Sequence, residues 1–168
     1  MRTDSDQPVE LTQEQAHRSK RMTGSPMRKL KEEINWKGIG DYLSAARTLQ
    51  EHGTSNTCGP RLHCQGLALE LALKLHLWDA SGEYSADHDL VSLASQCVSV
   101  QWTTDERDLI QILNREYRGT RPYHYPARYR PCPTTVVMMV AQDNLERIVS
   151  RVISATSQPH LVERILSR

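Results

Sequence analysis

The chain of 168 residues contains no phenylalanine, and no apolar run approaches the roughly 18 residues of a membrane-spanning helix. The polar N-terminal residues also lack the apolar core of a secretory signal peptide. These absences argue against a membrane protein and predict a cytoplasmic one. The net charge is only +1, so any attraction to nucleic acid must come from local clusters of basic residues.

Motifs that would establish an enzyme or a metal site are also missing. The sequence has no glycine-rich phosphate loop, no G-x-S-x-G and no H-E-x-x-H motif. A zinc site built from Cys58, His63 and Cys64 would have a spacing that fits no common structural zinc pattern. We therefore expect reduced, independent thiols, no bound metal and no cofactor.

Residues 67–77 read LALELALKLHL, with a leucine at every odd position. Strict alternation is typical of a half-buried strand, but every residue except His76 is a strong helix former and none is β-branched. On a helix, the leucines divide between two opposite sides, and Glu70 and Lys74 form a thin charged edge between them. The segment is therefore expected to be a helix in the centre of a bundle, apolar on two faces.

Helical spacing of apolar residues recurs along most of the chain. The predicted helices cover about residues 40–52, 60–79, 87–97, 103–118 and 134–156, and Pro159 begins a short final helix. Asp87 is expected to cap the third helix, and Thr103 and Glu106 form a capping box at the start of the fourth. The fold class is therefore all-α, an up-and-down bundle of about five helices over residues 36–168. Residues 1–35 are polar, mixed in charge and without an apolar stripe, and are expected to form a flexible N-terminal arm.

One segment is rich in both arginine and tyrosine. Four of the six tyrosines of the chain lie between Tyr117 and Tyr129, and no acidic residue occurs between Glu116 and Asp143. Guanidinium groups and aromatic rings together bind phosphates and stack on bases, and the four prolines of the segment restrict its backbone. Alternatively, the tyrosines pack the segment onto the bundle while the arginines cap helix ends or pair with carboxylates. The candidate ligand-binding residues are Tyr117, Arg121, Tyr123, Tyr125, Arg128 and Tyr129.

Two histidines are candidates for chemistry. His124 lies in the same segment and could act as a general acid or base, because an unperturbed imidazole has a pKa of about 6.5. A histidine between tyrosines is, however, more often a hydrogen-bonding loop residue. His88 stands between Asp87 and Asp89, but three successive side chains at a helix start point in different directions. Helix capping is therefore preferred to metal binding there.

Several motifs in one order resemble the HEPN family (higher eukaryotes and prokaryotes nucleotide-binding domain). They are DYLSAARTL at 41–49, GLALELALKLHLW at 66–78, HDLVSL at 88–93 and LNREYRGTRPY at 113–123. The resemblance covers about residues 38–156, and the order and spacing of the motifs carry it. It implies an up-and-down helical bundle that is often a homodimer, and two kinds of function.

Many HEPN proteins are metal-independent ribonucleases of toxin–antitoxin and other defence systems, with an R-x(4–6)-H motif from each subunit. Arg118 and His124, with five residues between them, satisfy this spacing. The resemblance implies that His124 would move the proton of the ribose 2′-OH while Arg118 or Arg121 steadies the scissile phosphate. Gly119, however, replaces the usual polar residue after the arginine, and Pro122 would break a helix across the motif.

Other HEPN proteins are non-catalytic modules that bind nucleotides or partner proteins, commonly beside a nucleotidyltransferase. Because of Gly119 and Pro122, we favour this function: a HEPN-like homodimer whose segment 117–130 binds a nucleotide, RNA or a protein partner. The first alternative is the ribonuclease, with an antitoxin as its partner protein. The second is a structural adaptor in which the segment is a dimer contact. Whether the chain is an enzyme stays open at this point.

Overall fold

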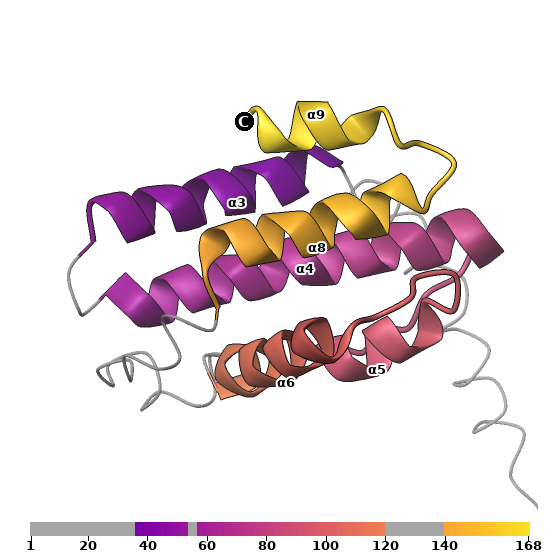
Figure 1. The fold of residues 1–168 in the computed structure, drawn as a ribbon, viewed down its shortest axis with the longest axis horizontal. Helices are drawn as coiled ribbons and strands as arrows, with labels where there is room; N and C mark the ends of the chain where they lie inside the picture. The colour runs from indigo at the N-terminus through magenta and orange to yellow at the C-terminus, as the bar shows by residue number, and fades with distance from the viewer. Residues whose placement is uncertain (1–35, 54–56, 120–139) are drawn as a thin grey trace, which may run out of the picture. The chain divides into compact units, whose positions relative to one another are not determined.

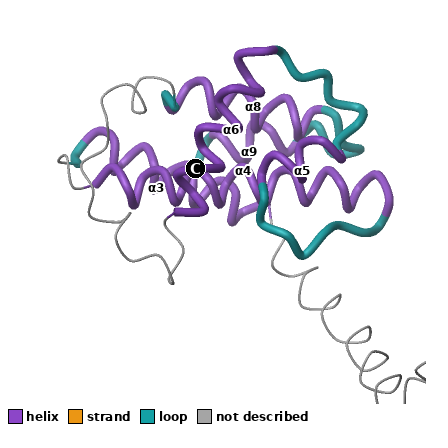
Figure 2. Tube along the Cα trace, turned by 90° about the horizontal axis from the view of Figure 1, so that it is seen from below, coloured by secondary structure: helices purple, strands orange, loops and turns teal. Residues whose placement is uncertain are grey.

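A computed structural model describes residues 36–53, 57–119 and 140–168, in which six helices and no strand occur (Figures 1 and 2). None of these helices is long and apolar enough to cross a membrane. The all-α prediction is confirmed for this part of the chain, and the proposed N-terminal arm lies outside it. The helices are α3 (Trp36–Glu51), α4 (Cys58–Ser81), α5 (Leu90–Gln96), α6 (Thr104–Gly119), α8 (Gln142–Ser154) and α9 (Leu161–Leu166).

Helix α4 is the central element, as its leucine pattern predicts. It packs against α3, α5, α6 and α8 (Figure 1). Leu69 and Leu73 are fully buried, and Leu75 and Leu77 are nearly so. The helix ends at Gly82, whose N–H donates to the Trp78 carbonyl and whose φ of 72° is the left-handed conformation that glycine adopts without strain.

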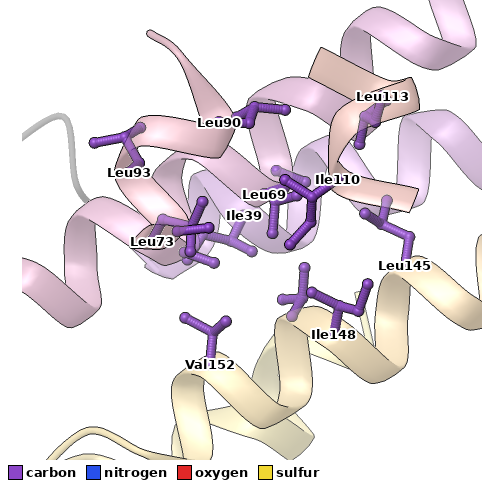
Figure 3. Packing of buried hydrophobic residues seen from close by; sticks show 14 of the residues in the cluster. Ile39, Leu69, Leu73, Leu90, Leu93, Ile110, Leu113, Leu145, Ile148 and Val152 are labelled. Atoms are coloured by element: carbon purple, nitrogen blue, oxygen red, sulfur yellow. The ribbon is translucent and has the colours of Figure 1, made fainter. Parts of the chain in front are cut away.

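Apolar side chains from all six described helices meet in one core, with Leu161 and Ile165 contributed by α9. Figure 3 shows Leu145, Ile148 and Val152 of α8 pointing toward Leu69 and Leu73 of α4. All five of these side chains are fully buried. Helices α3, α5 and α6 add further buried residues, among them Ile39, Leu90, Leu93, Ile110 and Leu113.

The capping box of α6 is confirmed. Thr103 Oγ1 accepts from the Glu106 N–H at 3.3 Å, and Glu106 Oε2 accepts from the Thr103 N–H at 2.9 Å. Arg151 of α8 donates to the same carboxylate, with Nη1 2.7 Å from Oε1. Burial alone would raise the pKa of Glu106, but the hydrogen bonds from Thr103 and the charge of Arg151 lower it overall. Glu106, in the first turn of α6, therefore also ties α6 to α8.

The predicted cap of α5 is wrong by two residues. Helix α5 begins at Leu90, and the side chain of Asp89 accepts from the Ser92 N–H at 2.9 Å. Asp87 instead accepts from the N–H groups of His88 and Asp89, which forms a turn before the helix. Both aspartates suit a cap by residue type, and the turn decides between them.

The predicted continuous helix over 134–156 is also wrong, because α8 begins only at Gln142. Ala141 is extended, with φ of −62° and ψ of 143°, and Val140 lies in a turn. Buried glutamines hold this geometry: Gln65 Nε2 donates to the Val140 carbonyl at 3.3 Å and to Gln142 Oε1 at 3.0 Å. Gln142 in turn donates to Glu146 Oε1 at 2.8 Å. Residues 134–139 lie outside the described part of the chain.

Helix α9 packs on α3, and three arginines join them. Arg47 Nε lies 2.6 Å from Glu146 Oε1, and its Nη2 donates to the Leu166 carbonyl at 2.9 Å. Arg168 Nη1 lies 2.7 Å from Asp41 Oδ1. The Arg164 guanidinium lies 4.7 Å from the centre of the Trp36 ring, a cation–π distance.

The cysteines differ from the expectation of four independent thiols. Cys58, the first residue of α4, is disulfide-bonded, whereas Cys64 and Cys97 are free. Burial raises the pKa of the Cys97 thiol to about 12, which keeps it protonated and unreactive.

Candidate functional site at the end of helix α6

The arginine- and tyrosine-rich segment begins where α6 ends. Tyr117 is the one candidate ligand-binding residue whose side chain the structure describes. Arg118 is described only as part of the α6 backbone. Arg121, Tyr123, His124, Tyr125, Arg128 and Tyr129 lie outside the described residues, so their roles stay predictions.

Tyr117 is held inside the bundle. Its side chain is 3% exposed, and its hydroxyl donates to Glu70 Oε2 at 2.7 Å. The ring lies against Gly66 of α4, where an added Cβ would come within 2.4 Å of the ring atom Cγ. The His63 ring lies 5.5 Å from the Tyr117 ring, centre to centre. Tyr117 thus fixes the last turn of α6 to the middle of α4.

Glu70 is the centre of a buried polar cluster. Its Oε1 lies 2.8 Å from Lys74 Nζ and 2.8 Å from His88 Nδ1, while its Oε2 accepts from Tyr117. Lys74 Nζ also lies 5.5 Å from the centre of the Tyr84 ring. Glu70 and Lys74 are only 4% and 5% exposed. The predicted charged edge on α4 is therefore wrong: the pair exists, but Tyr117 and residues preceding α5 cover it.

The cluster keeps Glu70 ionised. Burial alone would raise the pKa of this carboxyl group, since burial disfavours the charged form. The hydrogen bonds from Lys74 and Tyr117, together with the charges of Lys74 and His88, outweigh that effect and lower the pKa overall. Three hydrogen-bonding partners thus compensate one buried carboxylate.

His88 is the part of the cluster that solvent reaches, with half of its side chain exposed. The contact between Nδ1 and the Glu70 carboxylate fixes the orientation of the imidazole ring and leaves Nε2 directed away from Glu70. Among the described residues, Nε2 has no partner. Capping by this stretch is confirmed, but Asp89 is the cap of α5. His88 presents an oriented imidazole that can exchange a hydrogen bond with a ligand. The described residues contain no group of three side chains suited to hold a metal ion.

Sequence reasoning missed this cluster, although one signal pointed to it. Glu70 and Lys74 stand in the middle of an otherwise apolar helix, a position that often becomes buried when neighbours pack on both sides. His88 is 18 residues from Glu70, and no local pattern links them.

The pairing of Glu70 makes the stability of the protein sensitive to acid. Its folded pKa is below that of an unfolded glutamate, about 4.3. The stabilisation is therefore complete above that value and is lost as the pH falls through the folded pKa. We expect the free energy of unfolding, measured with urea from pH 7 to pH 3, to fall more steeply for the wild type than for Glu70→Gln. Glu83→Gln, at an exposed position, is the control and should keep the wild-type slope. Equal slopes for Glu70→Gln and the wild type would contradict the assignment.

Comparison of the chain with protein-family models, with curated proteins and with solved structures finds no match. The resemblance to HEPN domains thus continues to rest on the order and spacing of the four motifs.

Proposed function

We propose that this chain is a non-catalytic, HEPN-like helical module that binds a phosphate-bearing ligand, RNA or a nucleotide, through residues 118–130. Tyr117, which was a candidate for ligand contact, is buried and serves as the anchor of this segment. The observation that best supports the proposal is the attachment of Tyr117 to Glu70 and Gly66. This attachment fixes the residue that precedes the basic segment to α4 and α6, because Arg118 follows Tyr117 directly. Sites held on rigid elements lose less entropy when they bind.

Charge supports the same ligand class. The sequence after Glu116 contains Arg118, Arg121, Arg128 and Arg130 before the next acidic residue, Asp143. Guanidinium groups bind phosphate oxygens in pairs, and tyrosine rings stack on bases without strong sequence preference. The oriented imidazole of His88 lies in the cluster that anchors Tyr117, and it offers one more hydrogen-bonding group beside the start of the segment. The proposal includes a homodimer in the cytoplasm and a nucleotidyltransferase as protein partner; an antitoxin would be the partner in the ribonuclease alternative.

Arg121→Ala and Arg128→Ala are each expected to weaken binding of a labelled single-stranded RNA by about tenfold, because each removes a charged hydrogen bond to phosphate. The logarithm of the binding constant should fall with the logarithm of salt, and each substitution should reduce that slope by about 0.7. Fluorescence anisotropy at several salt concentrations measures both. Arg115→Ala is the matched control, since Arg115 is exposed on α6 and pairs with Glu116. Competition by ATP separates a nucleotide site from an RNA site.

Two other results would redirect the proposal. If both arginine variants bind RNA as the wild type does but differ from it in mass in solution, the segment is a dimer or adaptor contact. If the wild type cleaves RNA without metal and His124→Ala does not, the ribonuclease function takes precedence and the Gly119 and Pro122 departures are tolerated.

A further inference from the structure

A pocket of about 310 Å³ lies between α5, the turn that follows it and α6. It shares no lining residue with the Glu70 cluster. The lining residues are Val91, Ala94, Ser95, Cys97, Val98, Val100, Trp102, Arg107, Ile110 and Gln111. Its volume is at the lower end of the range of about 300–1,000 Å³ that is usual for small-molecule sites.

The pocket has an apolar floor and an exposed apolar rim. Ala94, Cys97 and Ile110 are buried core residues. Among the described residues, two large aliphatic side chains are exposed: Val91, at 38%, and Val98, at 92%. Both line this pocket. Exposed aliphatic groups gathered around one concave surface indicate an apolar ligand.

The polar groups of the pocket indicate the charge of that ligand. Arg107 is the one charged residue of the lining, and Gln111 is one turn further along α6. Both are exposed, and neither side chain makes a hydrogen bond or an ion pair with any described residue, although the Arg107 backbone N–H donates to the Thr103 carbonyl at 3.1 Å. Trp102 Nε1, by contrast, already donates to the Ala94 carbonyl at 3.0 Å, so it offers no donor. A ligand that pairs with this lining is therefore an anion with an apolar body.

We propose that this pocket binds a small amphipathic carboxylate, an acyl or aryl acid. The apolar body would occupy the space over Ala94, Cys97 and Ile110, and the carboxylate would pair with Arg107. The size of the pocket excludes long lipids, and its lining contains one cation where a nucleotide triphosphate would need several.

Decanoate is a suitable probe, and decanamide is its uncharged counterpart. Titration calorimetry on the full chain should show saturable binding of decanoate. Arg107→Gln should weaken decanoate binding at least about tenfold and leave decanamide binding unchanged, because only the charged hydrogen bonds are lost. Arg115→Gln, on the same helix but outside the pocket, should bind both as the wild type does.

Two further variants test the location. Val91→Trp, at a 38% exposed rim position, narrows the pocket and should weaken binding of both compounds. Val98→Asp places a negative charge at a 92% exposed rim position, where little packing is lost, and should weaken decanoate binding far more than decanamide binding. The proposal is overturned if the wild type shows no saturable binding of decanoate. It is overturned equally if Arg107→Gln and Val98→Asp bind decanoate as tightly as the wild type.

Discussion

Replacing Glu70 by leucine is expected to lower the free energy of unfolding by about 3–5 kcal/mol, the usual cost of removing one partner of a buried ion pair. The Lys74 ammonium would remain 5% exposed with no carboxylate beside it. The Tyr117 hydroxyl and His88 Nδ1 would lose the same acceptor. Urea unfolding at pH 7 measures the change.

A double-mutant cycle separates the ion pair from the other contacts of Glu70. Lys74→Met should cost less than Glu70→Leu, because the carboxylate keeps its hydrogen bonds to Tyr117 and His88. Glu70→Leu combined with Lys74→Met should recover part of the loss, since no buried charge then lacks a partner. If Glu70→Leu costs under about 1 kcal/mol and the second substitution restores nothing, the cluster does not have the role assigned to it.

Gly66→Ala is expected to destabilise the fold by about 1–3 kcal/mol, although alanine is intrinsically the better helix former by about 1 kcal/mol. The added Cβ would lie 2.4 Å from Tyr117 Cγ and 2.9 Å from Tyr117 Cβ. The ring cannot move away without lengthening its hydrogen bond to Glu70. The same variant should weaken RNA binding if the anchored Tyr117 positions the basic segment.

Gly38→Ala is the control for Gly66→Ala. At Gly38 of α3, an added Cβ meets only Leu71 Cδ1, at 3.5 Å, an ordinary contact. This substitution should therefore leave stability unchanged or raise it by up to about 1 kcal/mol. Opposite signs for the two glycines, measured by urea unfolding, are expected. A stabilising Gly66→Ala would mean that Tyr117 does not occupy the position seen on α4.

The parts of the fold that depend on local sequence were predictable. The helical period identified each helix of the described residues, and the Thr103 and Glu106 capping box depends on a spacing of three residues. The break before Gln142 depends on Gln65, 75 residues from Val140 in the sequence, so no window along the chain contains it. Asp87 and Asp89 both suit a helix cap by residue type, and the backbone turn between them decides which one serves.

In the candidate site, too, the local features were predictable from the sequence and the long-range contacts were not. Tyr117 stands out because tyrosine and arginine gather after it, yet its hydroxyl bonds a residue 47 positions earlier. Glu70 and Lys74 are recognisable as a pair from their spacing, whereas their burial depends on what α6 and the His88 turn place over them. Pairing is a local property of one helix, and burial is a property of the assembled bundle.

The packing of α9 on α3 also constrains how the chain is made. Arg47 reaches Leu166 across 119 positions, and Arg168 reaches Asp41 across 127. On a ribosome, the leucine-rich α4 would emerge well before α8 and α9, so its apolar surface would stay uncovered for several seconds at about 5–20 residues per second. During that interval the exposed leucines of α4 can bind chaperones or other nascent chains. The contacts between α3 and α9 form only after α9 has been synthesised.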